Sequence, residues 1–208
     1  MLGSHDTFTY LKTSNIIAKA STAFWRCQEK SIQDQYKFGV RLFDVRVINE
    51  DKDGFSWWRI GHGFAKVEQR FVNLKNICIY FQKEFPGSII RICLESGCSD
   101  EKIVERFKKE AADVFENYKD MIYTINIKKP WVNLYVGKQF KKTEYYACHL
   151  FNWNLEKSIL DNLKTFDISA GSIKSWAKKH NPDKITKEMK DDPDTLYFLD
   201  YVGVYPSK

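Results

Sequence analysis

The chain has 208 residues, 43% hydrophobic and 15% aromatic, a composition that excludes a disordered protein and predicts one domain over residues 1–208. Its net charge of +6 suits an anionic ligand, a membrane surface or nucleic acid equally, while its 27 acidic residues exclude a basic nucleic-acid-binding arm. No signal peptide is recognisable, and no apolar run approaches the roughly 18 residues of a membrane span, so we expect a cytoplasmic protein.

The first half of the chain alternates strand-like and helix-like patterns. Strands are expected at residues 1–4, 40–48 and 55–60, with a turn at residues 49–54. Helices are expected at residues 15–37, stopped by Gly39, and at residues 66–84, closed by Pro86-Gly87.

The second half continues the alternation. Further strands are expected at residues 88–94, 121–127 and 195–204, and the apolar run at 88–94 suits a buried parallel strand. Further helices are expected from residue 99 onward and at residues 172–180, whereas residues 128–165 give no clear assignment. The alternation predicts an α/β fold with a mainly parallel sheet.

The five cysteines have no zinc-type spacing. Cys27, Cys78 and Cys93 lie in apolar surroundings and are predicted to be buried free thiols, which favours a reducing compartment.

Two of the four histidines lie in short motifs, Gly3-Ser4-His5-Asp6-Thr7 and Gly61-His62-Gly63. Between these motifs, the strand that follows Gly39 carries Asp44 and Arg46. Two histidines with carboxylate partners, together with an arginine, are the groups that metal-free phosphodiester cleavage needs. One histidine takes a proton from an attacking hydroxyl, the other protonates the leaving oxygen, and the guanidinium holds the phosphate.

Together these motifs resemble the catalytic X region of bacterial phosphatidylinositol-specific phospholipase C. The resemblance covers about residues 1–65, through Gly3–Thr7, Gln33 and Gln35, Gly39–Arg46 and His62-Gly63. Asp200, in the last apolar segment, matches the final catalytic element of that family. The resemblance implies a distorted or incomplete (β/α)8 TIM-like barrel, with its site residues at the carboxyl ends of the strands.

The resemblance also implies roles for these residues. His5 would be the general base, oriented by Asp200, and His62 would be the general acid with Asp6 as its partner. Arg46 would bind the phosphate. The product would be a cyclic phosphodiester, formed by attack of a neighbouring hydroxyl of the substrate.

Four further residues belong to the expected site. Asp44 points to the same face of its strand as the phosphate-binding arginine and would align it. Glu95, Arg91 and Tyr201 are expected to contact the substrate. A purely structural reading remains open for Asp200, whose carboxylate could instead pair with Arg41 or Arg91.

A metal alternative also remains open. Asp6, Asp44 and Glu95 could together hold a hard divalent cation such as Ca²⁺. Arg46 argues against this, because its positive charge would occupy the place of the metal beside the phosphate. We therefore expect no cofactor.

The predicted function is a phosphodiesterase of the phospholipase C type, with an inositol phospholipid as substrate by resemblance. Two alternatives are a same-fold enzyme acting on a soluble nucleotide-like phosphodiester and a catalytically inactive module that binds a phosphate ligand. A lysine-rich aromatic segment could contact a membrane surface or an anionic ligand, or could be an ordinary solvated face. It comprises Lys128, Lys129, Lys138, Lys141 and Lys142 with Trp131, Tyr135, Phe140, Tyr145 and Tyr146. No protein partner and no structural nucleic-acid binding is expected.

Overall fold

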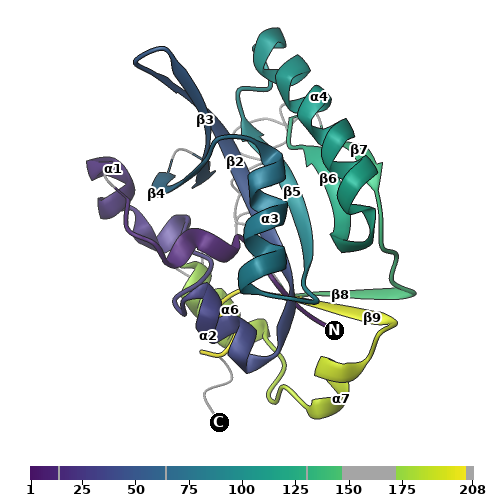
Figure 1. Cartoon of the computed structure of the whole chain (residues 1–208). Coiled ribbons are helices and arrows are strands. Elements are labelled where there is room, and N and C mark those ends of the chain that lie inside the picture. The colour runs from purple at the N-terminus through teal and green to yellow at the C-terminus, as the bar shows by residue number, and fades with distance from the viewer. Residues whose placement is uncertain (14, 64, 130, 147–171, 205–208) are drawn as a thin grey trace.

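Within the residues that the structure describes, nine strands form one curled sheet, and helices lie against it (Figure 1). The computed structural model describes residues 1–13, 15–63, 65–129, 131–146 and 172–204. The strands are β1 (Leu2–Ser4), β2 (Val40–Lys52), β3 (Phe55–His62), β4 (Ala65–Phe71), β5 (Ile89–Ser96), β6 (Ile122–Ile127), β7 (Val132–Val136), β8 (Lys142–Tyr146) and β9 (Thr195–Leu199). The helices are α1 (Ile16–Ala20), α2 (Ile32–Phe38), α3 (Leu74–Glu84), α4 (Glu101–Tyr118), α6 (Ile173–His180) and α7 (Lys187–Asp191). Short 3₁₀ helices are η1 (Thr7–Tyr10), η2 (Thr22–Phe24) and η3 (Lys119–Met121).

The strands follow the order β7-β6-β5-β2-β1-β9-β8, with β3 paired to β2 and β4 paired to β3. The run from β6 to β8 is parallel throughout, which confirms the mainly parallel sheet. Pairs β2–β3, β3–β4 and β6–β7 are antiparallel. In the described part of the chain β7 and β8 end the sheet without pairing to each other, so it is an open half-barrel. The carboxyl ends of its parallel strands therefore meet on one side, where barrel enzymes place their sites.

Helices α3 and α4 lie in front of the sheet in Figure 1 and pack against each other. Their buried apolar faces are Leu74, Ile77, Cys78 and Phe81 on α3 and Phe107, Ala111 and Val114 on α4. The side chain of Asp100 accepts hydrogen bonds from the first amides of α4, so this helix begins where the sequence predicts. The predicted buried thiols Cys27, Cys78 and Cys93 are confirmed, whereas Cys148 and residues 147–165 lie outside the described residues.

The predicted helix over residues 15–37 is wrong in its middle. Helix α1 ends at Ala20, and the chain is not helical from residue 25 to residue 31. This segment buries Cys27 and Gln28 completely, because their side chains have polar partners at the sheet edge. Gly39 ends α2 as predicted, with a φ of 116° that favours glycine.

The predicted helix over residues 66–84 is also wrong in its first third, which is strand β4. Ala65, Val67 and Phe71 are buried and alternate with exposed Glu68 and Arg70, a period of two that suits a strand. The helix begins only after Asn73, whose side chain caps α3.

Two strand boundaries also differ from the prediction. Strand β2 continues through the turn predicted at residues 49–54 and pairs with β3 as far as Lys52, which leaves only Asp53 and Gly54 to turn. Strand β9 ends at Leu199, so Asp200 follows the strand instead of lying within it.

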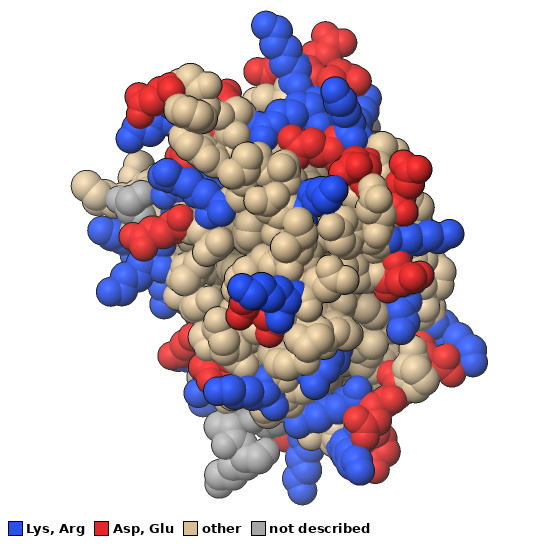
Figure 2. All heavy atoms as spheres, in the orientation of Figure 1, with Lys and Arg blue, Asp and Glu red and all other residues tan. Residues whose placement is uncertain are grey.

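The surface in Figure 2 carries lysine and arginine side chains interspersed with acidic ones around a central area that is mostly, but not wholly, uncharged. The positive excess is therefore not gathered into one patch on this face. Across the described part of the chain, no helix is both long enough and apolar enough to cross a bilayer.

Candidate active site

Polar side chains from five strands meet at the carboxyl-terminal side of the parallel sheet. His5 follows β1, Arg46 lies in β2, His62 ends β3, Glu95 lies near the end of β5, and Asp200 follows β9. All are buried except His62, whose side chain is 17% exposed. The predicted site residues are thus brought together from segments up to 195 positions apart.

His5 is held through both of its ring nitrogens. Its Nδ1 lies 2.8 Å from Oδ1 of Asp200, and its Nε2 lies 2.5 Å from Nη2 of Arg46. A guanidinium can only donate, so Nε2 accepts and Nδ1 carries the proton that is donated to Asp200. This is the tautomer that a general base needs.

The buried side chain of Gln28 holds the backbone around His5 in place. Its Nε2 donates to the carbonyls of His5 and Leu199, at 2.9 and 3.0 Å, and so ties the end of β1 to the end of β9. Its Oε1 accepts from the amide of Val202 at 3.1 Å. The role of Gln28 could not be predicted from the sequence, since a lone glutamine in a helix-like pattern gives no sign that its side chain will be buried.

Arg46 lies among three buried carboxylates. Its Nε is 2.7 Å from Asp6 Oδ1 and 3.1 Å from Asp44 Oδ2, and its Nη1 is 3.2 Å from Glu95 Oε2. Burial would lower the pKa of the guanidinium, but these carboxylates raise it well above its usual value. The contact predicted between Asp44 and Arg46 is present. A hard cation bound by Asp6, Asp44 and Glu95 would have to displace this guanidinium.

Two guanidinium groups hold the Asp44 carboxylate in its ionised form. Burial would raise its pKa, but Arg91 and Arg46 outweigh burial and hold the pKa below its usual value. Nη1 of Arg91 lies 3.5 Å from Asp44 Oδ2, and the guanidinium lies 5.5 Å from the centre of the Trp131 ring. Arg41, the other partner considered for Asp200, donates to the backbone carbonyls of Tyr36 and Val40.

His62 contacts Asp6, as predicted, and also a backbone carbonyl. Its Nδ1 lies 2.7 Å from the carbonyl oxygen of Trp25 and 3.3 Å from Oδ2 of Asp6. Because a carbonyl can only accept, Nδ1 carries a proton in this arrangement. Burial raises the pKa of Asp6 above its usual value, against the opposing effects of Arg46 and His62.

Glu95 is fixed by three donors. Its Oε1 accepts from the amide of Gly63 at 2.7 Å and pairs with Nζ of Lys128, while Oε2 pairs with Arg46. Burial would raise the pKa of Glu95, but Arg46, His62 and Lys128 lower it to about 2. Gly63 can present its amide because it adopts a φ of 59°, a conformation that other residues rarely adopt. Lys128 therefore pairs with a buried carboxylate, a role that neither reading of the lysine-rich segment predicts.

Two residues beside the proposed base and its partner have left-handed backbone conformations. Asp6 has a φ of 45° and Tyr201 a φ of 48°, and neither is a glycine. Such conformations cost about 1–3 kcal/mol and cluster at functional sites. Tyr201 is 4% exposed, and burial raises the pKa of its hydroxyl well above the usual value. Its predicted contact with a substrate stays a prediction.

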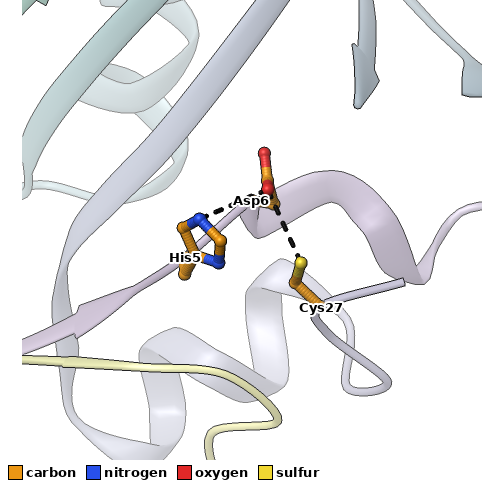
Figure 3. A group of neighbouring side chains, drawn as sticks. All are labelled: His5, Asp6 and Cys27. Carbon is orange, nitrogen blue, oxygen red and sulfur yellow. Dashed lines mark hydrogen bonds and ion pairs between the residues drawn. The ribbon is translucent and has the colours of Figure 1, made fainter. Parts of the chain in front are cut away.

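Cys27 is the residue of this cluster that the sequence analysis did not connect with the site. Its thiol lies 3.5 Å from Asp6 Oδ2 and 3.8 Å from His62 Nδ1, and Figure 3 shows it beside Asp6 and His5. Burial, with the negative charges of Asp200 and Asp6, raises the pKa of the thiol well above its usual value. The buried position of Cys27 was predictable from its apolar neighbours, but its polar partners come from distant segments.

Comparison with solved structures supports this geometry at the level of the fold. A phosphatidylinositol-specific phospholipase C from Staphylococcus aureus, its H258Y mutant, matches with a TM-score of 0.55 and 16% identity, over 98% of this chain and 85% of that one. A second structure of the S. aureus enzyme, from work on its membrane binding, matches with a TM-score of 0.52 and 14% identity, over 98% and 86% of the two chains. The fold is that of bacterial phosphatidylinositol-specific phospholipase C. The incomplete TIM-like barrel implied by the sequence motifs is thereby confirmed.

No protein-family model matches the chain, and no curated protein sequence matches it significantly. At 14–16% identity the similarity to the phospholipase C structures shows the fold alone. The role of each residue is therefore argued from the geometry of this chain.

Proposed function

We propose that the chain is a phosphodiesterase of the phosphatidylinositol-specific phospholipase C type, which cleaves by attack of a neighbouring substrate hydroxyl. The observation that carries the proposal is the pair of imidazoles around one carboxylate. The rings of His5 and His62 lie 6.3 Å apart, and Asp6 Oδ2 lies 3.4 Å from one and 3.3 Å from the other. This spacing leaves room for one phosphate between a base and an acid.

His5 is the base in this proposal. Its Nδ1 proton is held by Asp200, so the lone pair on Nε2 can take the proton of the attacking hydroxyl. In the absence of substrate, Nη2 of Arg46 occupies that lone pair. A substrate phosphate would draw the guanidinium toward its own oxygens and free Nε2 at the moment it is needed.

Arg46 binds the phosphate and stabilises the charge that develops during cleavage. Asp6, Asp44 and Glu95 hold its Nε and Nη1, which leaves Nη2 as the edge that faces the base. The Nε and Nη1 side of the guanidinium is thus fixed before the substrate arrives, and only the contact of Nη2 with His5 is exchanged for the phosphate.

His62 is the acid. Its Nδ1 proton is held by the carbonyl of Trp25 and by Asp6, so the imidazolium form can give its Nε2 proton to the leaving oxygen. Its partial exposure of 17% suits a leaving group that extends out of the site, as a diacylglycerol would. The products are a cyclic phosphodiester and the free alcohol.

An inositol phospholipid is the proposed substrate, and two exposed apolar features support contact with a membrane surface. On α1, Ile16 and Ile17 are 80% and 71% exposed, and Lys19 is exposed on the same short helix. Trp131 is 57% exposed, and its ring lies 5.5 Å from the guanidinium of Arg91. Apolar side chains flanked by lysine are the composition of interfacial membrane contacts.

The test is incubation of the purified protein with phosphatidylinositol vesicles in the presence of a chelator, followed by phosphorus NMR. We expect a cyclic inositol phosphate signal from the wild type and a rate lowered by about 10²–10⁴ in His5→Ala, the usual contribution of a general base. His180→Ala is the matched control, since the His180 ring stacks on Trp176 and lies outside the cluster. It should keep the wild-type rate.

Other outcomes would replace the proposal. Cyclic phosphate released from soluble diesters, but not from vesicles, would favour the soluble substrate. A folded protein that binds phosphatidylinositol vesicles without turning them over, even with Ca²⁺ restored, would favour the inactive binding module.

A further inference from the structure

The thiol of Cys27 completes a set of metal-binding donor atoms around Asp6. Oδ2 of Asp6 lies 3.4 Å from His5 Nε2, 3.5 Å from Cys27 Sγ and 3.3 Å from His62 Nδ1. Sγ of Cys27 lies 3.8 Å from His62 Nδ1. One ligand atom each from His5, Asp6 and Cys27 lie within 4.8 Å of one another, and all three residues are buried (Figure 3).

Four of the six separations among these donors are close to the edges of a tetrahedral zinc site. Bond lengths of about 2.0–2.1 Å to nitrogen or oxygen and about 2.3 Å to sulfur put neighbouring donors about 3.3–3.7 Å apart in a tetrahedron. The four separations that join Asp6, Cys27 and the two histidines lie in or next to this range, from 3.3 to 3.8 Å. His5, Asp6 and Cys27 are already close enough to share one ion, whereas the His62 ring must move toward His5 before it can serve as the fourth ligand.

A second observation points the same way. Metal-binding histidines usually donate the proton of their other ring nitrogen to a carboxylate, which fixes the ring and strengthens the ligand. His5 has this arrangement, because Nδ1 donates to Asp200 at 2.8 Å while Nε2 is the nitrogen on the Asp6 side. The outer partner of a carboxylate–histidine–metal arrangement is therefore present.

We propose that His5, Asp6 and Cys27, with His62 as a fourth ligand, bind a borderline-soft divalent cation such as Zn²⁺, and that this cation inhibits the enzyme. The proposal has a binding half and an inhibitory half, and the inhibitory half rests on the proposed function. The cation would hold the lone pair that His5 needs as a base and would take the nitrogen by which His62 is positioned as an acid. Metal binding and catalysis are then mutually exclusive uses of the same side chains.

Binding exchanges contacts that the structure shows. Nη2 of Arg46 must leave His5 Nε2, and His62 must give up its hydrogen bond to the Trp25 carbonyl. The thiol proton of Cys27 and the Nδ1 proton of His62 pass to the buffer when the two atoms become ligands. Arg46 Nε pairs with Oδ1 of Asp6, whereas the ion would take Oδ2, so the two cations would use different oxygens of the same carboxylate.

The ligand types determine which cation fits. One sulfur and two imidazole nitrogens favour Zn²⁺, Co²⁺ and Cd²⁺, whereas Ca²⁺ and Mg²⁺ prefer oxygen ligands alone. This site is distinct from the all-carboxylate set of Asp6, Asp44 and Glu95, which offers no soft ligand. Cys27 therefore decides between the two kinds of cation.

Cobalt titration tests the binding half without any assay of turnover. We expect the wild type to bind one equivalent of Co²⁺ with a thiolate-to-cobalt charge-transfer band that Zn²⁺ removes and excess Ca²⁺ does not. Cys27→Ser should lose the band and bind Zn²⁺ at least about 100-fold more weakly, since even outer-shell partners are worth 10–100-fold. Cys98→Ser is the matched control and should keep the band, because the Cys98 thiol lies near the Leu94 carbonyl instead of Asp6.

A wild type without the band, or a band that survives in Cys27→Ser, overturns the site. If Cys27→Ser fails to fold, cadmium NMR of the wild type replaces it, and a shift without sulfur coordination would equally overturn the site.

Turnover measured with Zn²⁺ tests the inhibitory half. We expect Zn²⁺ to abolish phosphodiester cleavage by the wild type over the concentration range in which it displaces Co²⁺. Cleavage by Cys27→Ser should not be inhibited at these Zn²⁺ concentrations. Full activity in zinc-loaded wild type overturns the inhibition while leaving the binding site. A protein without turnover on any phosphodiester would instead refute the proposed function, and the cobalt band would still decide the site.

Discussion

Replacing Glu95 by glutamine removes a buried charge while keeping the size and shape of the side chain. The Glu95 side chain is fully buried and accepts from Gly63, Lys128 and Arg46. Its pKa falls from the usual 4.5 to about 2, which corresponds to on the order of 3 kcal/mol of folding stability at neutral pH. Glu95→Gln should therefore be destabilised by that order, because two cations lose the charge that pairs with them.

The pH dependence of this loss is the sharper part of the prediction. The pKa of Glu95 is lower in the folded state than in the unfolded state, so its stabilisation is complete above pH 4.5 and disappears as the pH falls toward 2. The difference between wild type and Glu95→Gln should shrink to about half near pH 3 and vanish below about pH 2.

Urea unfolding followed by fluorescence, at several pH values between 7 and 3, measures this difference directly. Glu105→Gln is the matched control, because Glu105 pairs with Lys108 at an exposed position and should leave stability and its pH dependence nearly unchanged. A difference below about 1 kcal/mol at pH 7 would refute the reasoning, given the 3–5 kcal/mol typical of breaking a buried pair. So would a difference that stays constant down to pH 3.

Three further predictions follow from separate features. Asp200→Asn should lower kcat by about 10³ with little change in KM, because the amide no longer holds the Nδ1 proton of His5. A fall of less than tenfold in steady-state turnover would contradict this prediction. Gly61→Ala should lower the free energy of unfolding by at least about 2 kcal/mol, since the added Cβ would lie 2.7 Å from the Ala65 carbonyl oxygen. Gly63→Ala should lower it by only about 1 kcal/mol, because its Cβ meets no atom within 4 Å and the cost comes from the left-handed backbone alone. Equal losses of stability in thermal unfolding would contradict the packing at Gly61. Ile16→Ser with Ile17→Ser should weaken binding to phosphatidylinositol vesicles at least about tenfold in sedimentation, because two exposed apolar side chains are removed, and unchanged binding would rule out α1 as the membrane contact.

The sequence predicts the site residues that lie within local motifs, but it does not predict those whose role depends on partners far away in the chain. His5, Asp6, Arg46 and His62 are recognisable because strand ends and short motifs fix their positions relative to the backbone. Asp200 could be placed only through its match to the last catalytic element of the family that the motifs resemble, and in the structure it pairs with His5.

Lys128 and Cys27 could not be assigned to the site from the sequence. Lys128 belongs to a lysine-rich segment, and only the pairing of β6 with β5 brings it to Glu95. Cys27 lies in a segment that resembles a helix, but the burial of its polar contacts overrides the local helical preference. Strand β4 was missed for a simpler reason, since its short alternation runs directly into the periodicity of helix α3.

The position of β1 between β2 and β9 has a consequence for how the protein acquires activity during synthesis. The hydrogen bond between His5 and Asp200 spans 195 residues, so β1 leaves the ribosome long before the strand that supplies its partner. Contacts of such long range form late, because the chain entropy of closing the loop is lost before the contact stabilises it. A nascent chain whose His5 motif has left the ribosome before β9 is synthesised still lacks Asp200, the carboxylate that sets the tautomer of the proposed base. The proposed cleavage activity should therefore arise in a single step, when β9 joins the sheet.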